Sequence, residues 1–222
     1  MSLSLRLPPV LVFALLVWAS ACGQGSSSTL DGPPTFDASP ADADLPRGAF
    51  EGFGRNATGG EGGQVVWVTT LADSGPGSLR DAVSGPDRIV RFQVAGTIAL
   101  ASALVVAGPN LTIDGFSAPA PGITLTTSTL EIPGDANGPG LRGSNLIVQG
   151  LRIRDVSQDD SIRIAYNAHN IVIDHCSVSN SGDGDMDVTE GAFDVTLSYN
   201  ILSRNTASGA SLLSSNASRV TY

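Results

Sequence analysis

A short phrase of sequence that returns at nearly constant spacing constrains the fold of this chain most. Its copies begin at Asn145, Asn170, Asp194 and Ser218, which are 25, 24 and 24 residues apart. A repeat of this length is typical of a solenoid, in which each unit packs against its neighbours. Apolar residues alternate within every copy, as a half-buried strand requires. The repeat unit is therefore predicted to be a β-strand.

Two further alternating segments follow each copy at the same period. The inward positions of the first segment form two columns: Leu151, Cys176 and Asn200, then Ile153, Val178 and Leu202. Those of the second segment come in pairs: Ile162 and Ile164, Met186 and Val188, Ala210 and Leu212. Three short strands per turn of about 24 residues describe an all-β fold, the right-handed, single-stranded parallel β-helix. A β-sandwich with coincidental spacing is the alternative.

The first 46 residues are predicted to lie outside the folded domain. Residues 1–21 contain an early arginine, a short apolar run and small residues before Cys22, which is the pattern of an export signal with a lipoprotein-type box. Cys22 would then be lipidated, on the surface of the cell. Because Ala19 stands where such a box usually has leucine, ordinary secretion is the alternative. Residues 22–46 are rich in Gly, Ser, Pro, Asp and Ala, and are predicted to be a disordered tether.

Residues 47–222 are long enough for one domain and short for two. With Cys22 lipidated or removed, Cys176 is predicted to pack as a small apolar residue, and no disulfide is expected. The net charge is −9, and all twelve basic residues are arginine. Such an acidic domain is a poor partner for nucleic acid, and we expect membrane contact only through the lipid anchor. We expect a monomer.

Several motifs of this domain occur together in one known family. They include Glu51-Gly-Phe-Gly-Arg, the segments 64–70, 71–83 and 88–98, Asn110-Leu-Thr-Ile-Asp-Gly, Leu146-Ile-Val-Gln-Gly and Ile173-Asp-His-Cys. With these motifs the chain resembles bacterial pectate lyases, which are parallel β-helix polysaccharide lyases, over nearly all of residues 47–222. The segment Ser74–Val83 is predicted to form a turn and a short helix that caps the first coil. The resemblance implies that the domain is incomplete at its C-terminal end.

Acidic residues gather around the third strand of two consecutive coils. They are Asp159 and Asp160 in one coil, and Asp183, Asp185 and Asp187 in the next. Because adjacent coils stack, residues about 24 apart in sequence come within roughly 5 Å of each other. Crowded carboxylates repel unless a proton or a cation relieves them, and oxygen ligands without His or Cys suit Ca²⁺. A solvated acidic face is the alternative.

The resemblance also implies which residues hold the metal. It places calcium ligands on Asp160, Asp183 and Asp187, and a further family ligand on Gln158, with Asp159 as the nearest substitute. Asp185 would alternate away from its neighbours, and for this residue a role in the metal site and a local role are both open. Four other polar residues are predicted to have local roles: Asp174 and Asp194 at turns, His175 at a bend hydrogen-bonded between coils, and His169 in a surface loop.

The family reaction implied by the resemblance is β-elimination on polygalacturonate or a related acidic polysaccharide, and it requires a base. The family uses an Arg, which would lie in the coil after Tyr222, where the chain ends. The assisting family Lys falls on Ala207, and the chain contains no Lys. Arg219 does not match the catalytic position, and Arg204 could partly replace the charge of the Lys. We therefore predict a metal-binding face without its base.

Three functions are compatible with these residues. The first is a calcium-dependent pectate lyase, or a lyase for a related uronate polymer. The second is a non-catalytic relative that binds acidic polysaccharide through calcium. The third is a β-helix hydrolase that uses two carboxylates as acid and base, although the opening motifs match lyases better.

Overall fold

The computed structural model describes residues 50–204, 211, 213 and 216–222, and the statements below refer to these residues. Internal contacts divide the chain into Met1–Asp37, which lies outside the described residues, and Ala38–Tyr222, which holds every element below. The predicted signal, Cys22 and the tether therefore remain predictions. In the described part of the chain, no helix is long and apolar enough to cross a membrane.

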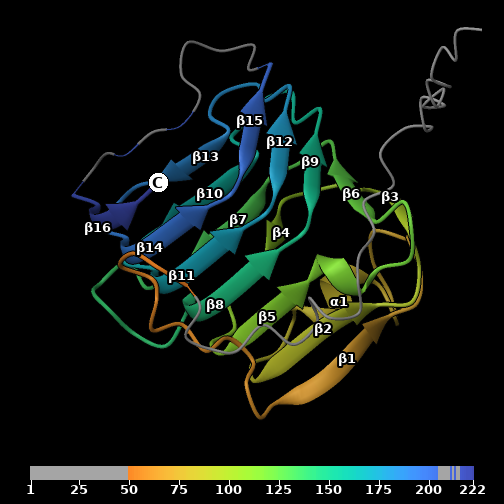
Figure 1. Ribbon diagram of the computed structural model, residues 1–222, viewed down its shortest axis with the longest axis horizontal. Coiled ribbons are helices and arrows are strands. Elements are labelled where there is room, and N and C mark those ends of the chain that lie inside the picture. Colours follow the sequence, from red (N-terminus) through yellow and green to blue (C-terminus); the bar gives the residue numbers. More distant parts are fainter. Residues whose placement is uncertain (1–49, 205–210, 212, 214–215) are drawn as a thin grey trace, which may run out of the picture. The chain divides into compact units, whose positions relative to one another are not determined.

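The chain winds through three parallel sheets (Figure 1). Sheet A is formed, in order, by β1 (Gln64–Val68), β2 (Arg88–Phe92), β5 (Leu111–Asp114), β8 (Ser144–Gln149), β11 (His169–Asp174), β14 (Phe193–Ser198) and β16 (Ser218–Thr221). Sheet B is formed by β3 (Gly96–Ala99), β6 (Ile123–Thr126), β9 (Arg152–Arg154), β12 (Ser177–Ser179) and β15 (Ile201–Ser203). Sheet C is formed by β4 (Leu104–Val105), β7 (Leu130–Pro133), β10 (Ile162–Ala165) and β13 (Met186–Val188). The predicted parallel β-helix is confirmed.

The predicted columns are in register across neighbouring coils. Leu146 pairs with Ile171, and Ile171 pairs with Val195, in sheet A. In sheet B, Val178 lies between Ile153 and Leu202. Nearly all inward side chains are fully buried in one core that runs through the coils. Burial of these apolar columns, at roughly 25 cal/mol per Å², is the main stabilisation of the fold.

The last coil is one residue longer than predicted. Val220 pairs with Val195, so Arg219, and not Ser218, occupies the position beside Asp194. In sheet C, Val188 faces Leu213 and not Leu212. Leu212 and Ala210 themselves lie outside the described residues. Strict alternation makes a shift of one residue decisive, because it moves each side chain to the other face of the sheet.

The polar residue that opens each repeat phrase has a conformational reason. From β2 to β16 the residue at this corner of sheet A is left-handed, with φ between 51° and 60° in Asp87, Asn110, Asn145, Asn170, Asp194 and Arg219. Asn and Asp tolerate this region better than other residues with a side chain. The Nδ2 of Asn145 donates to Oδ1 of Asn110 at 2.8 Å, and Nδ2 of Asn110 donates to Oδ1 of Asp87 at 2.8 Å. The corners thus form a hydrogen-bonded ladder.

An N-terminal strap, residues 50–63, crosses the outer face of sheet A. Its backbone is held by side chains of the sheet: the N–H of Gly54 donates to Thr196 at 2.9 Å, and that of Gly60 donates to Thr112 at 3.0 Å. Ala57 packs on Ile147 and Val172 in a small second core. The strap therefore ties late coils to early ones, and it covers apolar side chains that would otherwise face water.

We predict that Asn145→Ala lowers the free energy of unfolding by about 2 kcal/mol, because it combines left-handed strain with lost hydrogen bonds. The Oδ1 of Asn145 accepts from the strap N–H groups of Thr58 at 2.7 Å and Gly59 at 3.1 Å, and its φ is 56°. Asn145→Gly removes the strain and keeps the loss of hydrogen bonds. Urea unfolding should place Asn145→Gly between the wild type and Asn145→Ala. Equal stability of the two variants would exclude strain at this corner.

The predicted cap helix is present, and it is short. Helix α1 (Leu79–Ala82) starts after Ser78, whose side chain accepts from the N–H of Asp81 at 3.2 Å. Leu79 and Ala82 join the main core. Arg80 donates to the carbonyl of Ala103 at 2.7 Å and pairs with Asp73 at 2.6 Å. Arg80 therefore fastens the cap to the following turn.

The prediction for Cys176 is confirmed: it is a free, buried thiol, and burial raises its pKa from 9.0 to about 12. Asn200 stands beside it in the next coil and is only half-buried. Its Oδ1 accepts from the N–H of Cys176 at 2.8 Å, and its Nδ2 donates to the carbonyl of Ile173 at 2.9 Å. Asn200 therefore satisfies backbone groups at the bend, and it does not fill the core as the column had suggested.

Candidate functional site

The acidic residues meet where the loops before β10 and β13 lie side by side. Ile162 pairs with Met186, so the residues before them are also neighbours. The Oδ1 of Asp160 accepts from the N–H of Gly184 at 2.9 Å, and the N–H of Asp183 donates to the carbonyl of Asp159 at 3.3 Å. The expectation that stacking would bring the two acidic segments together is met.

Gly184 lies between two of the predicted metal ligands. A Cβ at this position would collide with Oδ1 of Asp187 and would lie 2.8 Å from Oδ1 of Asp160. Both carboxylates are nearly buried, with 6% and 7% of their surface exposed, whereas Asp183 is exposed. The cluster therefore has two shielded carboxylates at its base and one at the surface. The sequence contains the signal for this spacing, the Asp-Gly-x-x-Asp pattern from Asp183 to Asp187.

Electrostatics in the cluster disfavour a charged Asp160. Burial is the largest cause that raises the pKa of Asp160, and the charges of Asp159 and Asp183 add to it. The N–H of Gly184 and the more distant Arg163 act in the opposite direction, without cancelling the shift. A bound cation would remove this penalty, because it would favour the ionised carboxylate.

The arrangement fits calcium in the type of its donors. Among the described residues, no three His, Cys, Asp or Glu side chains are placed so that they alone could hold a metal ion. Calcium, however, takes six to eight oxygens at flexible geometry and accepts water and substrate oxygens among them. Two shielded carboxylates and one exposed carboxylate would supply only part of such a shell. The rest would come from water or from an acidic ligand.

Asp185 does not belong to the cluster. Its Oδ1 accepts from Ser181 Oγ at 2.5 Å, and this hydroxyl is 2.7 Å from Ser161 Oγ. Burial raises the pKa of Asp185, and no neighbouring charge contributes to the shift. Its Oδ2 is buried and, within the described residues, has no hydrogen-bond partner. Asp185 therefore alternates away from its neighbours and holds a buried polar network together.

Arg163 is the positive charge nearest the cluster that sequence reasoning missed. It points outward from β10, level with Asp187 on β13 and Glu131 on β7. Its guanidinium pairs with Glu190 at 3.0 Å and with Glu131 at 3.6 Å. It also lies 5.3 Å from the ring centre of Tyr166. The outward position between Ile162 and Ile164 was the available signal.

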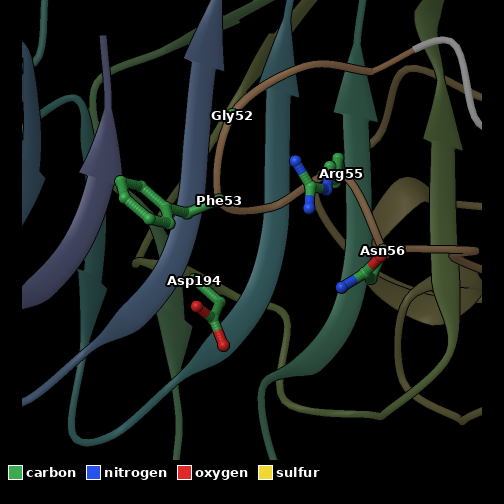
Figure 2. Close-up of a pocket in the computed structure, with 5 residues that line it drawn as sticks. All are labelled: Gly52, Phe53, Arg55, Asn56 and Asp194. Carbon is green, nitrogen blue, oxygen red and sulfur yellow. The ribbon is translucent and has the colours of Figure 1, made fainter.

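A hollow lies beneath the strap on sheet A, apart from the acidic cluster (Figure 2). It has a volume of about 350 Å³, and Phe53, Arg55 and Asn56 of the strap face Asp194 of β14 around it. Asp194 holds Arg219 through two bonds of 2.5 and 2.8 Å, so Asp194 is more than a turn residue. This hollow lies over sheet A, whereas the acidic cluster belongs to sheet C.

The two histidines also lie on sheet A. His175 is at a left-handed bend, with φ 49°, and its N–H donates to the carbonyl of Ser198 in the next coil, as predicted. Its Nδ1 is 2.6 Å from Oδ2 of buried Asp174, whose Oδ1 accepts from Ser198 at 2.6 Å. The prediction for His169 is wrong: it starts β11 and stacks on Phe193 at 4.7 Å.

The remaining catalytic expectations fall at the edge of the described chain. Arg204 is exposed at a left-handed corner, with φ 58°, beside Asn180 of the previous coil. Ala207, which corresponds to the family Lys, lies outside the described residues. Arg219 is committed to Asp194, and its guanidinium lies 5.0 Å from the ring centre of Phe193. Arg219 is therefore not free to act as the predicted base.

Comparison with known proteins shows which proteins this chain is similar to. No family model matches the chain. A protein of Emericella nidulans named probable pectate lyase C is 42% identical over an alignment of 161 positions, which covers 69% of this chain and 35% of that protein. The chain is similar to pectate lyases over its β-helix. Probable pectate lyase 4 of Arabidopsis thaliana is 34% identical over 168 residues, covering 69% of this chain and 42% of the plant protein.

A solved structure is also similar to this chain. The major cedar pollen allergen jun a 1 matches with a TM-score of 0.55 and 26% identity, over 68% of this chain and 48% of the allergen. The relatives are fungal and plant proteins, so the comparisons support the family without its bacterial branch. The chain spans about a third of the length of the fungal relatives that it matches.

Proposed function

We propose that this chain serves calcium-dependent β-elimination of polygalacturonate or a related acidic polysaccharide. The observation that carries the proposal is the acidic cluster of Asp160, Asp183 and Asp187 beside sheet C, in a chain related to pectate lyases. Burial raises the pKa of Asp160, and the charges of Asp159 and Asp183 add to this shift. An acidic polymer cannot approach such a surface unless a cation mediates the contact.

Asp160 and Asp187 would hold the calcium ion through shielded oxygens, and Asp183 through an exposed one. The fourth family position is altered: Gln158 is exposed, and Oδ1 of Asp159 accepts from the N–H of Asp160 at 2.9 Å. Bound calcium would supply the positive charge that attracts a uronate carboxylate and acidifies the proton on C5. Because calcium tolerates water and substrate oxygens, a cluster open on one side suits this role.

The elimination also needs a group that accepts the C5 proton. By the resemblance, the family Arg lies after Tyr222 and the family Lys falls on Ala207. We therefore assign cation binding and substrate binding to the described residues and leave proton transfer outside them. Arg163 stays charged between Glu131 and Glu190, so its role is to balance the acids of this face.

The experiment is to incubate the protein with polygalacturonate and calcium, and to follow both polymer binding and the ultraviolet absorbance of the unsaturated product. Residues 47–222 alone should bind the polymer with calcium; where the coil that carries the family Arg is present, we expect absorbance to rise with calcium and to stop on addition of a chelator. Calcium-dependent binding without absorbance, with that coil present, would contradict the lyase reaction and leave a polysaccharide-binding protein. New reducing ends without absorbance would indicate a hydrolase. If the protein shows no binding and forms no product, the proposal is rejected altogether.

We also propose that the domain acts outside the cell as a monomer. The support is the export pattern in residues 1–21 and the tether in residues 22–46. A lipid on Cys22 would make the protein a cell-surface lipoprotein of bacterial type. The mass of the mature N-terminal peptide distinguishes a lipidated Cys22 from ordinary cleavage.

A further inference from the structure

A hollow of about 320 Å³ lies on the outer side of sheet C. Its lining comes from β4, β7, the end of β10 and the loop after β7: Val105, Glu131, Pro133, Asp135, Arg142 and Tyr166. We call it the Arg142 pocket. The strands of sheet C follow in the order β13, β10, β7, β4. At about 4.8 Å per strand, β7 lies about 10 Å from β13. The pocket and the acidic cluster therefore lie on the same sheet, close enough for one short oligosaccharide to reach both.

The wall of the Arg142 pocket is an insertion in one coil. Leu111 of β5 and its partner Leu146 of β8 are 35 residues apart, whereas Leu146 and Ile171 are 25 apart. Gly143 has φ 55°, and a Cβ there would lie 2.5 Å from the carbonyl oxygen of Pro133. The carbonyl of Asp135 accepts from Asn167 Nδ2 at 2.8 Å. Both ends of the loop are therefore fastened, so the wall is a fixed part of the fold.

Arg142 is the uncommitted positive charge of this wall. It is exposed, its Nε donates to the carbonyl of Pro133 at 3.3 Å, and among the described residues it has no carboxylate partner. Arg163, in contrast, is paired on both sides. In a chain of net charge −9, an unpaired guanidinium inside a pocket is a specific feature. Its planar fork of donors matches a carboxylate in two hydrogen bonds.

The acids of the Arg142 pocket do not occupy this guanidinium. Glu131 is directed to Arg163 at 3.6 Å. The carboxylate of Asp135 lies against Gly140 of its own loop, where an added Cβ would collide with Oδ2. The half-buried ring of Tyr166 and the side chain of Val105, which is 40% exposed, add apolar surface. A pocket that combines apolar faces with a few fixed polar groups is typical of small-ligand sites.

We propose that the Arg142 pocket is a uronate subsite. It takes one sugar of the acidic polysaccharide that the acidic cluster binds through calcium, with the sugar carboxylate on the guanidinium of Arg142. The sugar ring lies against Tyr166 and Val105, and its hydroxyl groups donate to Glu131 and Asp135. This inference rests on the proposed function, because it concerns the same polymer on the same sheet.

The test is the affinity of the whole chain for oligogalacturonate in the presence of calcium, measured by isothermal titration calorimetry. Arg142→Ala is expected to weaken binding roughly ten-fold, the loss of one charge-assisted carboxylate contact. Arg142→Gln, which keeps most of the side chain, should lose nearly as much. Arg55→Ala is the matched control: it removes one exposed arginine at the other hollow (Figure 2), and it should bind like the wild type.

A methyl-esterified oligosaccharide separates charge recognition from shape. Wild type should prefer the free acid, and Arg142→Ala should lose most of that preference. Wild-type affinity in both Arg142 variants, with calcium dependence retained, would overturn the subsite and leave the proposed function standing. An equal loss in Arg55→Ala would also overturn it, because net charge alone would then explain the effect. Absence of binding by the wild type would overturn both proposals.

Discussion

Replacing Gly54 with alanine is expected to lower the free energy of unfolding by about 3 kcal/mol, because overpacking here meets backbone and not side chains. An added Cβ would collide with the carbonyl oxygen of Ile171 and lie 2.9 Å from the N of Thr196. These atoms belong to the middle of sheet A and are held by strand pairing on both sides. The strap must therefore lift.

Lifting the strap removes two kinds of stabilisation. The hydrogen bonds from Gly54 N to Thr196 Oγ1 and from Thr196 Oγ1 to the carbonyl of Glu51 are lost, and each contributes about 0.5 to 1.5 kcal/mol. Ala57 is also drawn away from Ile147 and Val172, whose apolar surface then faces water. Each contribution follows from the same displacement, so the expected effect exceeds that of Asn145→Ala.

The control for Gly54→Ala is Gly62→Ala, in the same strap. Gly62 has φ 75°, and no atom lies within 4 Å of an added Cβ, so only backbone strain of about 1 kcal/mol is expected. Urea unfolding of the two variants measures the difference. If Gly54→Ala costs no more than Gly62→Ala, the close approach of the strap to sheet A does not contribute to stability.

The coiled architecture could be predicted from sequence because its determinants are local. Alternation marks each strand, and the Asn or Asp at the start of a phrase marks a left-handed corner. Once the period is known, stacking follows without further information. The same logic placed Asp160 beside Asp183, since both precede equivalent strands. Local patterns repeated at a constant interval are therefore enough to assemble distant residues.

Features that depend on contacts between distant segments could not be predicted. Gly54 and Thr196 are 142 positions apart, and nothing near either residue indicates that they touch. The coil between β5 and β8 has 35 residues and so interrupts the period of about 24. For this reason the repeat can be recognised in the sequence only from Asn145 onward. Arg80 bonds to Asp73 before it and to Ala103 in a later turn, and no residue next to Arg80 in the sequence indicates these contacts. Arg142 gave no signal for the same reason, since its pocket is built from three strands and a loop.

Asp160→Asn is expected to abolish the stabilisation of the fold by calcium. A ligand that binds only the folded state stabilises it by about 2.7 kcal/mol at a concentration one hundred times its dissociation constant. Wild type should therefore melt at a higher temperature when calcium is added, and Asp160→Asn should not. Glu51→Gln, at an exposed position on the strap, makes the same change in formal charge and should keep the full calcium shift.

Without calcium, the same substitution should raise the stability of the folded state. The amide oxygen of an asparagine can still accept from Gly184 N, while the unfavourable charge beside Asp159 and Asp183 disappears. Asp160→Asn should therefore be more stable than wild type in chelator at neutral pH. A variant that is stabilised without the ion and indifferent to the ion cannot be explained by general damage to the fold.

The pH dependence follows from the raised pKa of Asp160. Near pH 4 the unfolded chain begins to ionise this group while the folded chain keeps it protonated, so the stability that Asp160 contributes at lower pH is lost as pH rises through its folded pKa. The measurement is the melting temperature of wild type minus that of Asp160→Asn, plotted against pH. In chelator this difference should fall as pH rises through the folded pKa. In calcium it should not fall, because the ion favours the carboxylate. A calcium shift that survives in Asp160→Asn would mean that the cation binds elsewhere, and a wild type without any shift would remove the cation from this surface.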